Sequence, residues 1–385
     1  MEQEDTTIFV ISNPHILHYK KIVKKWIKRE KNYYRYSTLF DYLYEEGRLE
    51  ILRSGNVSSF RNPNLNKIFS KTMFNNLEFF IWLCINRLLN RKIKIYKNVG
   101  DINANNRVIL DFAATWDQST SDHVLKLLSF KGLILVHMTH YFKNSNLIFD
   151  LLPKFKHLVL LSEGNVLEND FFRKNIREKL VEINVPFVID HLLYQAPKIS
   201  VNNPRNSKCL VMGSPNIYHY NPDLLDFYET DYLNPDRTNF RKLAISDERF
   251  TFEPGKIAQN SHDFKKTLEE LYLETSLFFT GSEIIGLPSI NTFEGMYFGA
   301  LYIGPRDPIH KSLGFVDGVN YLSYTPGDYS NFTEVVNYAL SNSKLSSRIS
   351  KQGQKFAIDN FNAQIVFRRL VKKVDRLLLN KKLQL

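Results

Sequence analysis

The sequence has little cysteine and lacks the short motifs that bind metals. Its two cysteines, Cys84 and Cys209, each lie inside an apolar run, and they form no CxxC pair. Buried thiols without such spacing exclude a disulfide scaffold and a zinc cluster, and they are typical of a reducing compartment. HxxxH, HExxH and DxD patterns are also missing. We therefore expect no metal and no other cofactor.

Long apolar runs are missing as well. The longest run, "LEFFIWLCINRLL" (77–89), has 13 residues and contains an arginine, whereas a membrane-spanning helix needs about 20. The start, "MEQEDTTIFVIS", is acidic and then strand-like, which is not the pattern of a secretory signal. We expect a cytoplasmic protein with, at most, a peripheral contact with the inner face of a membrane.

Acidic residues are too few to balance the basic ones, and the net charge is +11 with a pI of about 9.3. Such an excess suits nucleic acid, an anionic membrane or an anionic small substrate. Because RNP, zinc-finger and helix-turn-helix patterns are lacking, we expect no nucleic acid partner. The segments "YKKIVKKWIKREK" (19–31) and "FRRLVKKVDRLLLNKKLQL" (367–385) are basic and amphipathic. That pattern fits either an anionic membrane face or a solvated helix face.

Short apolar runs alternate with helical patterns along the whole chain. They predict strands at 7–12, 107–113, 132–138, 157–162, 186–190, 209–214, 249–255, 276–282, 300–304 and 321–324. Strands that are apolar throughout and separated by helices indicate parallel sheets covered on both faces. The fold class is therefore α/β, with two doubly wound, Rossmann-like domains facing a cleft. The predicted parts are a first domain at 1–195, a linker at 196–208, a second domain at 209–360 and a basic helix at 361–385.

In such sheets, ligands bind beyond the carboxyl ends of the strands. In the first domain this edge holds Asn13, His140 and Glu163, which follow predicted strands or lie in the next loop. Asn13 and His140 are candidates for substrate contact, and Glu163 is a candidate general acid or base. The ordinary alternatives are a helix start at Pro14, and a capping or ion-pairing role for Glu163.

In the second domain, "SINTFEGMYFGALYIGPRDP" (289–308) follows a predicted strand and opens a helix. We expect Asn291 or Thr292 to be the N-cap and Glu294 to lie in the first turn. One explanation of Glu294 is its favourable interaction with the helix dipole. The other is that its carboxylate accepts hydrogen bonds from ribose hydroxyls while nearby amides face a phosphate.

The stretch "GSEIIGLPSINTFEGMYFGALYIGPRDP", with "GFVDGVNYLSYTPGD" and the closing basic helix, resembles the donor domain of GT-B glycosyltransferases. The resemblance covers about residues 209–375 and implies that Glu294 binds the donor ribose. Asn291, Thr292, Gly213 and Ser214 would then lie along the donor, and Lys256 would meet its phosphate. The sequence departs from the family in one respect. The two glutamates that this family usually has lie eight residues apart, whereas Glu283 and Glu294 lie eleven residues apart.

The acidic stretch "DFYETDYLNPDR" (226–237) is either a surface loop or part of the cleft. Its core, "FYETDYLNPDR", resembles β-Kdo transferases that use CMP-Kdo in lipopolysaccharide and capsule assembly. That likeness implies that Asp231 is the nucleophile, with Glu163 as its companion. Arg237 is a candidate partner for an anionic substrate.

The function we expect is transfer of a sugar from a nucleotide-activated donor, with CMP-Kdo as one candidate, to a glycan or lipid-linked glycan acceptor. The context would be cell-surface polysaccharide biosynthesis. The alternatives are a transferase that uses a nucleotide-diphosphate hexose, a sugar-nucleotide epimerase on the same fold, and a binding protein without catalysis.

Overall fold

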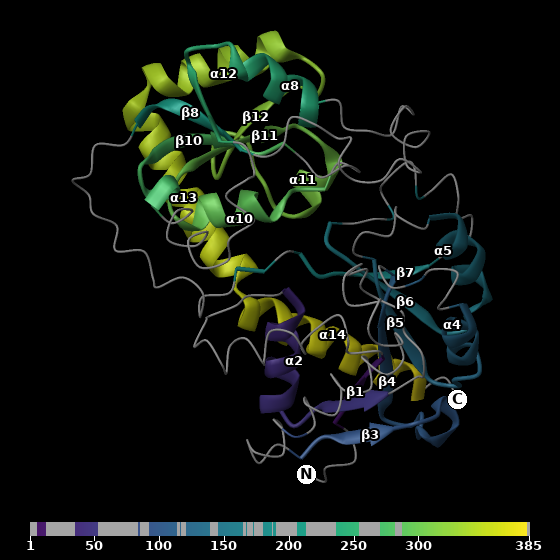
Figure 1. Cartoon of the computed structure of the whole chain (residues 1–385). Helices are drawn as coiled ribbons and strands as arrows, with labels where there is room; N and C mark the ends of the chain where they lie inside the picture. The colour runs from purple at the N-terminus through teal and green to yellow at the C-terminus, as the bar shows by residue number, and fades with distance from the viewer. Residues whose placement is uncertain are drawn as a thin grey trace. The chain divides into compact units, whose positions relative to one another are not determined.

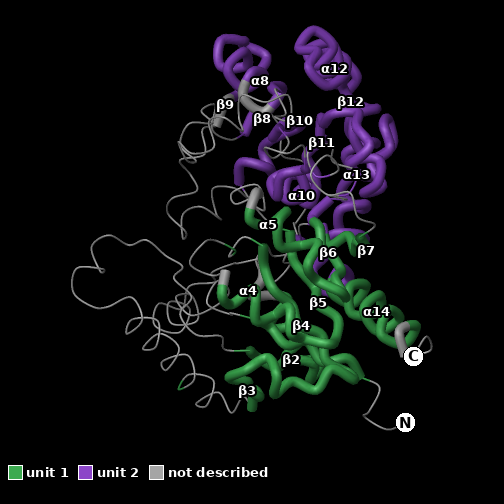
Figure 2. The backbone as a smooth tube through the Cα atoms, turned by 90° about the vertical axis from the view of Figure 1, so that its right-hand side faces the viewer, with its two compact units in different colours: residues 1–162, 175–185, 367–385 green, residues 163–174, 186–366 purple. Residues whose placement is uncertain are grey.

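The structure is a computed structural model, and the described part of the chain consists of separate stretches. These are residues 6–12, 35–52, 84, 92–113, 116, 121–138, 145–164, 167, 172, 180–186, 188–189, 206–212, 236–253, 270–281 and 287–382. They form two compact units, each around a parallel sheet (Figures 1 and 2). Unit 1 comprises 1–162, 175–185 and 367–385, and unit 2 comprises 163–174 and 186–366.

The sheet of unit 1 has seven parallel strands in the order β3-β2-β1-β4-β5-β6-β7. The strands are β1 Ile8–Ser12, β2 Leu49–Leu52, β3 Lys94–Tyr96, β4 Arg107–Phe112, β5 Leu133–His137, β6 Leu158–Ser162 and β7 Val181–Asn184. Central strands such as β5 and β6 are buried at every position, because helices cover both faces of a doubly wound sheet. Progression along the sheet reverses between β1 and β4, so the switch point lies there.

Helices α2 Arg35–Glu45, α4 Ser121–Leu127 and α5 Ser145–Leu151 belong to unit 1, with short 3-10 turns at Val99–Asp101 and Leu152–Lys154. The predicted strand at 186–190 was wrong. The strand is β7, a few residues earlier, and Ile189 forms only an isolated bridge with Asn362. The last helix, α14 Ala363–Lys382, lies in unit 1 from Phe367 onward.

Unit 2 has five parallel strands in the order β12-β11-β10-β8-β9. They are β8 Asn206–Met212, β9 Phe250–Glu253, β10 Thr275–Phe279, β11 Leu301–Pro305 and β12 Leu322–Tyr324. The helices are α8 Asp236–Ile245, α10 Ile290–Tyr297, α11 Pro308–Ser312, α12 Tyr329–Ser341 and α13 Ser343–Phe361. Strand β8 thus begins inside the segment predicted as linker. The switch point of this sheet lies between β8 and β10.

Aromatic side chains fill both faces of the second sheet. Phe279 packs with Phe240 and Phe332 on one face, whereas its neighbour Phe278 packs with Tyr272 and Tyr302 on the other. Successive residues of a strand point to opposite faces, so one short strand supplies both cores. These two sheets confirm the predicted α/β fold of two doubly wound domains.

The two cysteines differ in their surroundings. Cys209 is buried in β8, as expected, and burial raises its pKa. Cys84 is exposed, so its apolar sequence context gave the wrong expectation. Among the helices that the structure describes, none combines the length and apolar character required to cross a membrane.

Candidate functional site

Helix α10 begins at the carboxyl edge of the second sheet, earlier than predicted. Its N-cap is Ser289, and the helix runs from Ile290 to Tyr297. The prediction of Asn291 or Thr292 as N-cap was therefore wrong, and Glu294 lies beyond the first turn. The helix dipole acts mainly within the terminal turn, so it does not explain why a carboxylate stands at this position.

A cluster of three buried hydroxyls joins the end of β10 to the start of α10. The Oγ1 atom of Thr280 lies 3.1 Å from Oγ1 of Thr292 and accepts a hydrogen bond from Ser289 Oγ at 3.0 Å. The guanidinium of Arg241 donates to the Thr280 carbonyl. Because Ser289 is used in this cluster, it makes no capping bond to the helix. The cluster fixes the first turn of α10 against the switch point of the sheet.

A second buried chain of polar groups lies beside this cluster. The Asp307 carboxylate is 2.9 and 3.0 Å from Nδ1 of His310, and Nε2 of His310 is 3.1 Å from the Tyr302 hydroxyl. In the tautomer with its proton on Nδ1, His310 donates to the Asp307 carboxylate and accepts at Nε2 from the Tyr302 hydroxyl. Burial raises the pKa of Tyr302, against an opposing hydrogen bond with Thr292. Tyr302 therefore stays a neutral donor.

Glu294 is 7% exposed and its neighbour Asn291 is partly exposed. The nearby Tyr272 donates to the Asn291 carbonyl at 3.2 Å. Burial raises the pKa of Tyr272 and the charge of Glu294 raises it further. Thr292 is fully buried, and its amide donates to the Ser289 carbonyl. Three residues were predicted to lie along the nucleotide-sugar donor. Of these, Glu294 and Asn291 keep some exposure to solvent, whereas Thr292 is buried and its contacts hold the start of α10.

The glycines around Glu294 have packing and turn roles. A Cβ at Gly295 would lie 2.5 Å from Cζ of Phe278 and 2.8 Å from Cε1 of Tyr272. Gly299 follows the helix with φ of +76°, a left-handed conformation that favours glycine at a helix end. The side chains of α13 also close on this region, because Ser350 donates to the Gly299 carbonyl and Gln354 to that of Tyr297. The glycines allow α10 to press against aromatic rings.

The switch point of the first sheet carries another buried polar cluster. The register pairs Ile11 with Leu110, so Ser12 and Asp111 follow side by side at the ends of β1 and β4. The Ser12 hydroxyl is 2.8 Å from Nε2 of His123, which is 3.6 Å from Oδ2 of Asp111. Trp116 donates its indole N–H to the same carboxylate oxygen at 3.1 Å. We call Ser12, Asp111, Trp116 and His123 the switch-point cluster.

The residues of this cluster are almost completely removed from solvent. Ser12, Asp111 and Trp116 are 0% exposed and His123 is 5% exposed. The Oδ1 atom of Asp111 has no hydrogen-bond partner in the described part of the chain. A buried carboxylate oxygen without a donor is costly, and a hydroxyl group of a ligand would supply one. Sequence reasoning missed Asp111 and His123. The indole of Trp116 stacks on Phe155.

Glu163, one of the two predicted catalytic residues, directly follows β6 and is 7% exposed. The segment that it begins is grouped with unit 2. A Cβ on the adjoining Gly164 would lie 3.0 Å from Cδ2 of Leu287 and 3.3 Å from Cγ2 of Ile309. Glu163 therefore lies where it was predicted to lie, directly after the end of a strand. His137 is buried in β5.

Most of the other predicted site residues lie outside the described part of the chain. They are Asn13, His140, Gly213, Ser214, Asp231 and Lys256. Arg237 lies in α8, and only its backbone is described. These assignments remain predictions.

The acidic stretch 226–237 contributes one residue whose role is visible. Asp236, the first residue of α8, is buried and accepts a hydrogen bond from the Gly327 amide at 2.8 Å. Burial raises its pKa, and the charge of Asp307 raises it further, against the hydrogen bond from Gly327. Asp236 therefore ties α8 to the turn after β12.

The turn before β12 and Arg306, which follows β11, form one local network. Asp317 Oδ1 accepts from the Ser323 amide, and Oδ2 lies 3.5 Å from Arg306 Nη2. Asn320 accepts from the Val316 amide and donates to the Gly314 carbonyl. Asp317 and Asn320 thus shape the turn.

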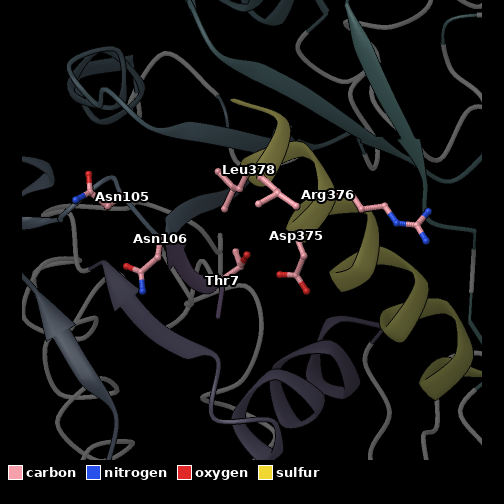
Figure 3. Close-up of a pocket in the computed structure, with 7 residues that line it drawn as sticks. Thr7, Asn105, Asn106, Asp375, Arg376 and Leu378 are labelled. Carbon is pink, nitrogen blue, oxygen red and sulfur yellow. The ribbon is translucent and has the colours of Figure 1, made fainter. Parts of the chain in front are cut away.

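A cavity of about 290 Å³ lies at the opposite edge of the first sheet (Figure 3). It is lined by Thr7, Asn105, Asn106, Asp375, Arg376, Leu378 and Leu379. Thr7 precedes β1 and Asn106 precedes β4, so the cavity adjoins the amino ends of these strands. None of the predicted site residues lines it. Among the described residues, no group of three His, Cys, Asp or Glu side chains is arranged to hold a metal ion.

No protein family and no curated protein matches this sequence, but several solved structures match its fold. HepE from Anabaena, in complex with UDP, has 11% identity and a TM-score of 0.54 over 96% of this chain and 100% of that one. Sucrose-phosphate synthase from Thermosynechococcus elongatus has 10% identity and a TM-score of 0.53 over 97% and 100%. A glycosyltransferase from Rickettsia africae has 11% identity and a TM-score of 0.51 over 97% and 98%. The chain therefore has the fold of the GT-B glycosyltransferases, with two Rossmann-like domains.

Proposed function

We propose that this protein is a glycosyltransferase that moves a sugar from a nucleotide-activated donor to a glycan acceptor. The observation that carries the proposal is the fold likeness to HepE, which spans 96% of the chain and includes complexes with UDP and with UDP-glucose. Fold alone does not define an activity. Further support comes from the polar residues at the switch point of each sheet.

In unit 2, we propose that Glu294 and Asn291 contact the donor nucleotide. The hydroxyl cluster of Thr280, Ser289 and Thr292 fixes the turn on which Asn291 stands. A carboxylate such as Glu294 can accept two hydrogen bonds from the vicinal hydroxyls of a ribose. The role of this carboxylate is therefore to orient the donor.

In unit 1, the switch-point cluster is buried, and its role is to fix the ends of β1 and β4, beyond which the acceptor would bind. The bond from Trp116 to Asp111 and the contact between Ser12 and His123 hold these strand ends. Deprotonation of an acceptor hydroxyl by a positioned base is a common contribution to group transfer. Asp231 and Glu163 remain our proposed chemical groups from the family resemblance.

The proposal also covers the nucleotide of the donor and the kind of acceptor. HepE was crystallised with UDP and with UDP-glucose, which favours a uridine nucleotide, whereas "FYETDYLNPDR" favours CMP-Kdo. A surface polysaccharide or lipid-linked glycan would be the acceptor, reached from an anionic membrane face. An epimerase on the same fold would convert the donor without an acceptor.

A thermal-shift comparison of UDP, CMP, GDP and ADP tests the donor site. A nucleotide that binds only the folded chain stabilises it by about 2.7 kcal/mol at a hundredfold excess over Kd. Glu294→Gln should reduce the shift, because an amide accepts less strongly and also presents donors. Glu334→Gln is the matched control, since Glu334 is exposed on α12. The proposal is contradicted if none of the four nucleotides shifts Tm.

A second measurement separates transfer from epimerisation. The stabilising nucleotide is supplied as its sugar conjugate, with and without a glycan acceptor. A transferase gives a glycosylated acceptor and free nucleotide, while an epimerase gives an isomerised nucleotide sugar without acceptor. Isomerisation without transfer would replace the proposed function with the epimerase.

A further inference from the structure

Helix α14 presents an exposed face that carries only positive charge. Its exposed cations are Arg368, Arg369, Lys372, Lys373 and Arg376. At 100° per residue these positions fall within an arc of about 140° on the helix. We call these five residues the α14 cationic face.

The opposite side of the helix is already occupied. Phe367, Leu370, Val374 and Leu378 are at most 8% exposed, and Phe367 packs against Tyr42 of α2 with ring centroids 6.0 Å apart. The apolar stripe is therefore part of the folded core of unit 1. It is not available to enter a lipid bilayer, which changes what the amphipathic sequence means.

The negative charge on α14 lies at one edge of the cationic face, about 20° around the helix from Arg368. The only acidic residue between Ala363 and Lys382 is Asp375, and it accepts two hydrogen bonds from Arg48 at 2.9 and 3.1 Å. This carboxylate is thus paired with a cation of the turn between α2 and β2. Leu379, 56% exposed, adds one apolar side chain next to the cations.

From these observations we propose that the α14 cationic face docks the protein on an anionic phospholipid surface. The partner is argued from charge complementarity, because clusters of four to eight Lys or Arg side chains recognise anionic lipid headgroups. The inference rests on the proposed function only in that a lipid-linked acceptor would place the substrate at the same surface.

The buried apolar stripe also defines the binding mode. Attachment is electrostatic, with Leu379 as a minor apolar contact, and the helix does not insert. Such an interaction is screened by salt, because the Debye length falls from about 10 Å at 0.1 M to about 3 Å at 1 M. Binding should therefore disappear at high ionic strength.

The test is co-sedimentation of the full chain with vesicles of phosphatidylcholine alone or mixed with phosphatidylglycerol. The variant K372Q/K373Q/R376Q removes three charges from the face and keeps good helix formers. Each cation near an anionic surface contributes about fivefold to binding, so the variant should bind anionic vesicles about a hundredfold more weakly. The matched control is K344Q/R348Q/K351Q, which removes three exposed charges from α13 and should bind nearly as the parent does.

Three outcomes would overturn the inference. The unmodified chain could bind both kinds of vesicle equally, the two triple variants could weaken equally, or a DNA duplex could compete with vesicles and lose affinity in the α14 variant alone. The last result would make the face a nucleic-acid surface. Nucleotide-induced stabilisation measured without vesicles tests the proposed function separately, so failure of one is distinguishable from failure of the other.

Discussion

Substitution of Gly295 by alanine tests how closely α10 is seated on the second sheet. The added Cβ would lie 2.5 and 2.6 Å from Cζ and Cε2 of Phe278 and 2.8 Å from Cε1 of Tyr272. Both rings are 0% exposed, so neither can turn out to solvent. Either the rings or the helix must move.

The expected magnitude follows from two opposing effects. Overpacking of a well-filled core costs about 1–3 kcal/mol, while alanine gains up to about 1 kcal/mol over glycine in a helix. We expect Gly295→Ala to lower the free energy of unfolding by about 1–2 kcal/mol. For a unit of this size that lowers Tm by roughly 2–8 °C.

Scanning calorimetry of the full chain measures the effect. The control is Gly100→Ala, because a Cβ there meets nothing within 4 Å and should change stability by less than about 0.5 kcal/mol. Since α10 carries Asn291 and Glu294, Gly295→Ala should also weaken nucleotide binding. If Gly295→Ala is as stable as the control, the close seating of α10 is refuted.

Two further predictions concern unit 1. Burial raises the pKa of Glu50, but hydrogen bonds from Arg107 and Tyr96 outweigh it and hold the pKa below its usual value. These hydrogen bonds therefore stabilise the folded chain fully above the pKa of an unfolded glutamate, about 4.3. The stabilisation is lost as pH falls through the lower pKa that Glu50 has in the folded chain. Glu50→Gln should cost about 1–3 kcal/mol at pH 7, and urea unfolding should show the gap from the parent closing on acidification; a constant gap would contradict this. Trp116→Phe keeps a ring but removes the donor to buried Asp111 and should cost about 1–3 kcal/mol, whereas unchanged unfolding would show that the indole N–H does not hold that carboxylate.

The central strands were predictable because burial on both faces requires continuous apolar runs. Strands β4, β5 and β6 have such runs and lie within a residue or two of the predicted bounds. Strands β2, β3 and β7 were missed, because each has only three or four residues and the latter two contain exposed positions. Short outer strands owe their structure to pairing with neighbours, which a local pattern does not contain.

The site was only partly predictable for a related reason. Glu294 stood out because a charge among aromatic residues is unusual in any local context. The bond between Ser12 and His123 joins residues 111 apart in sequence, and neither residue has a local motif. Likewise, the start of α10 shifted because Ser289 bonds Thr280, a tertiary contact, instead of capping the helix. Strand order creates these groupings, so they become visible only in the folded chain.

The path of the last helix has a practical consequence for dissecting the molecule. Unit 1 takes its first 162 residues from the start of the chain and its last 19 from residues 367–385. A single cut in the middle would therefore leave the amino-terminal fragment without Phe367, Leu370 and Val374, which are buried in its core. Residues 186–366 hold most of unit 2 in one stretch, but unit 1 is complete only when residues 175–185, with β7, and both ends of the chain are present. Proteolysis within α14 would consequently expose the core of the unit that contains the amino terminus.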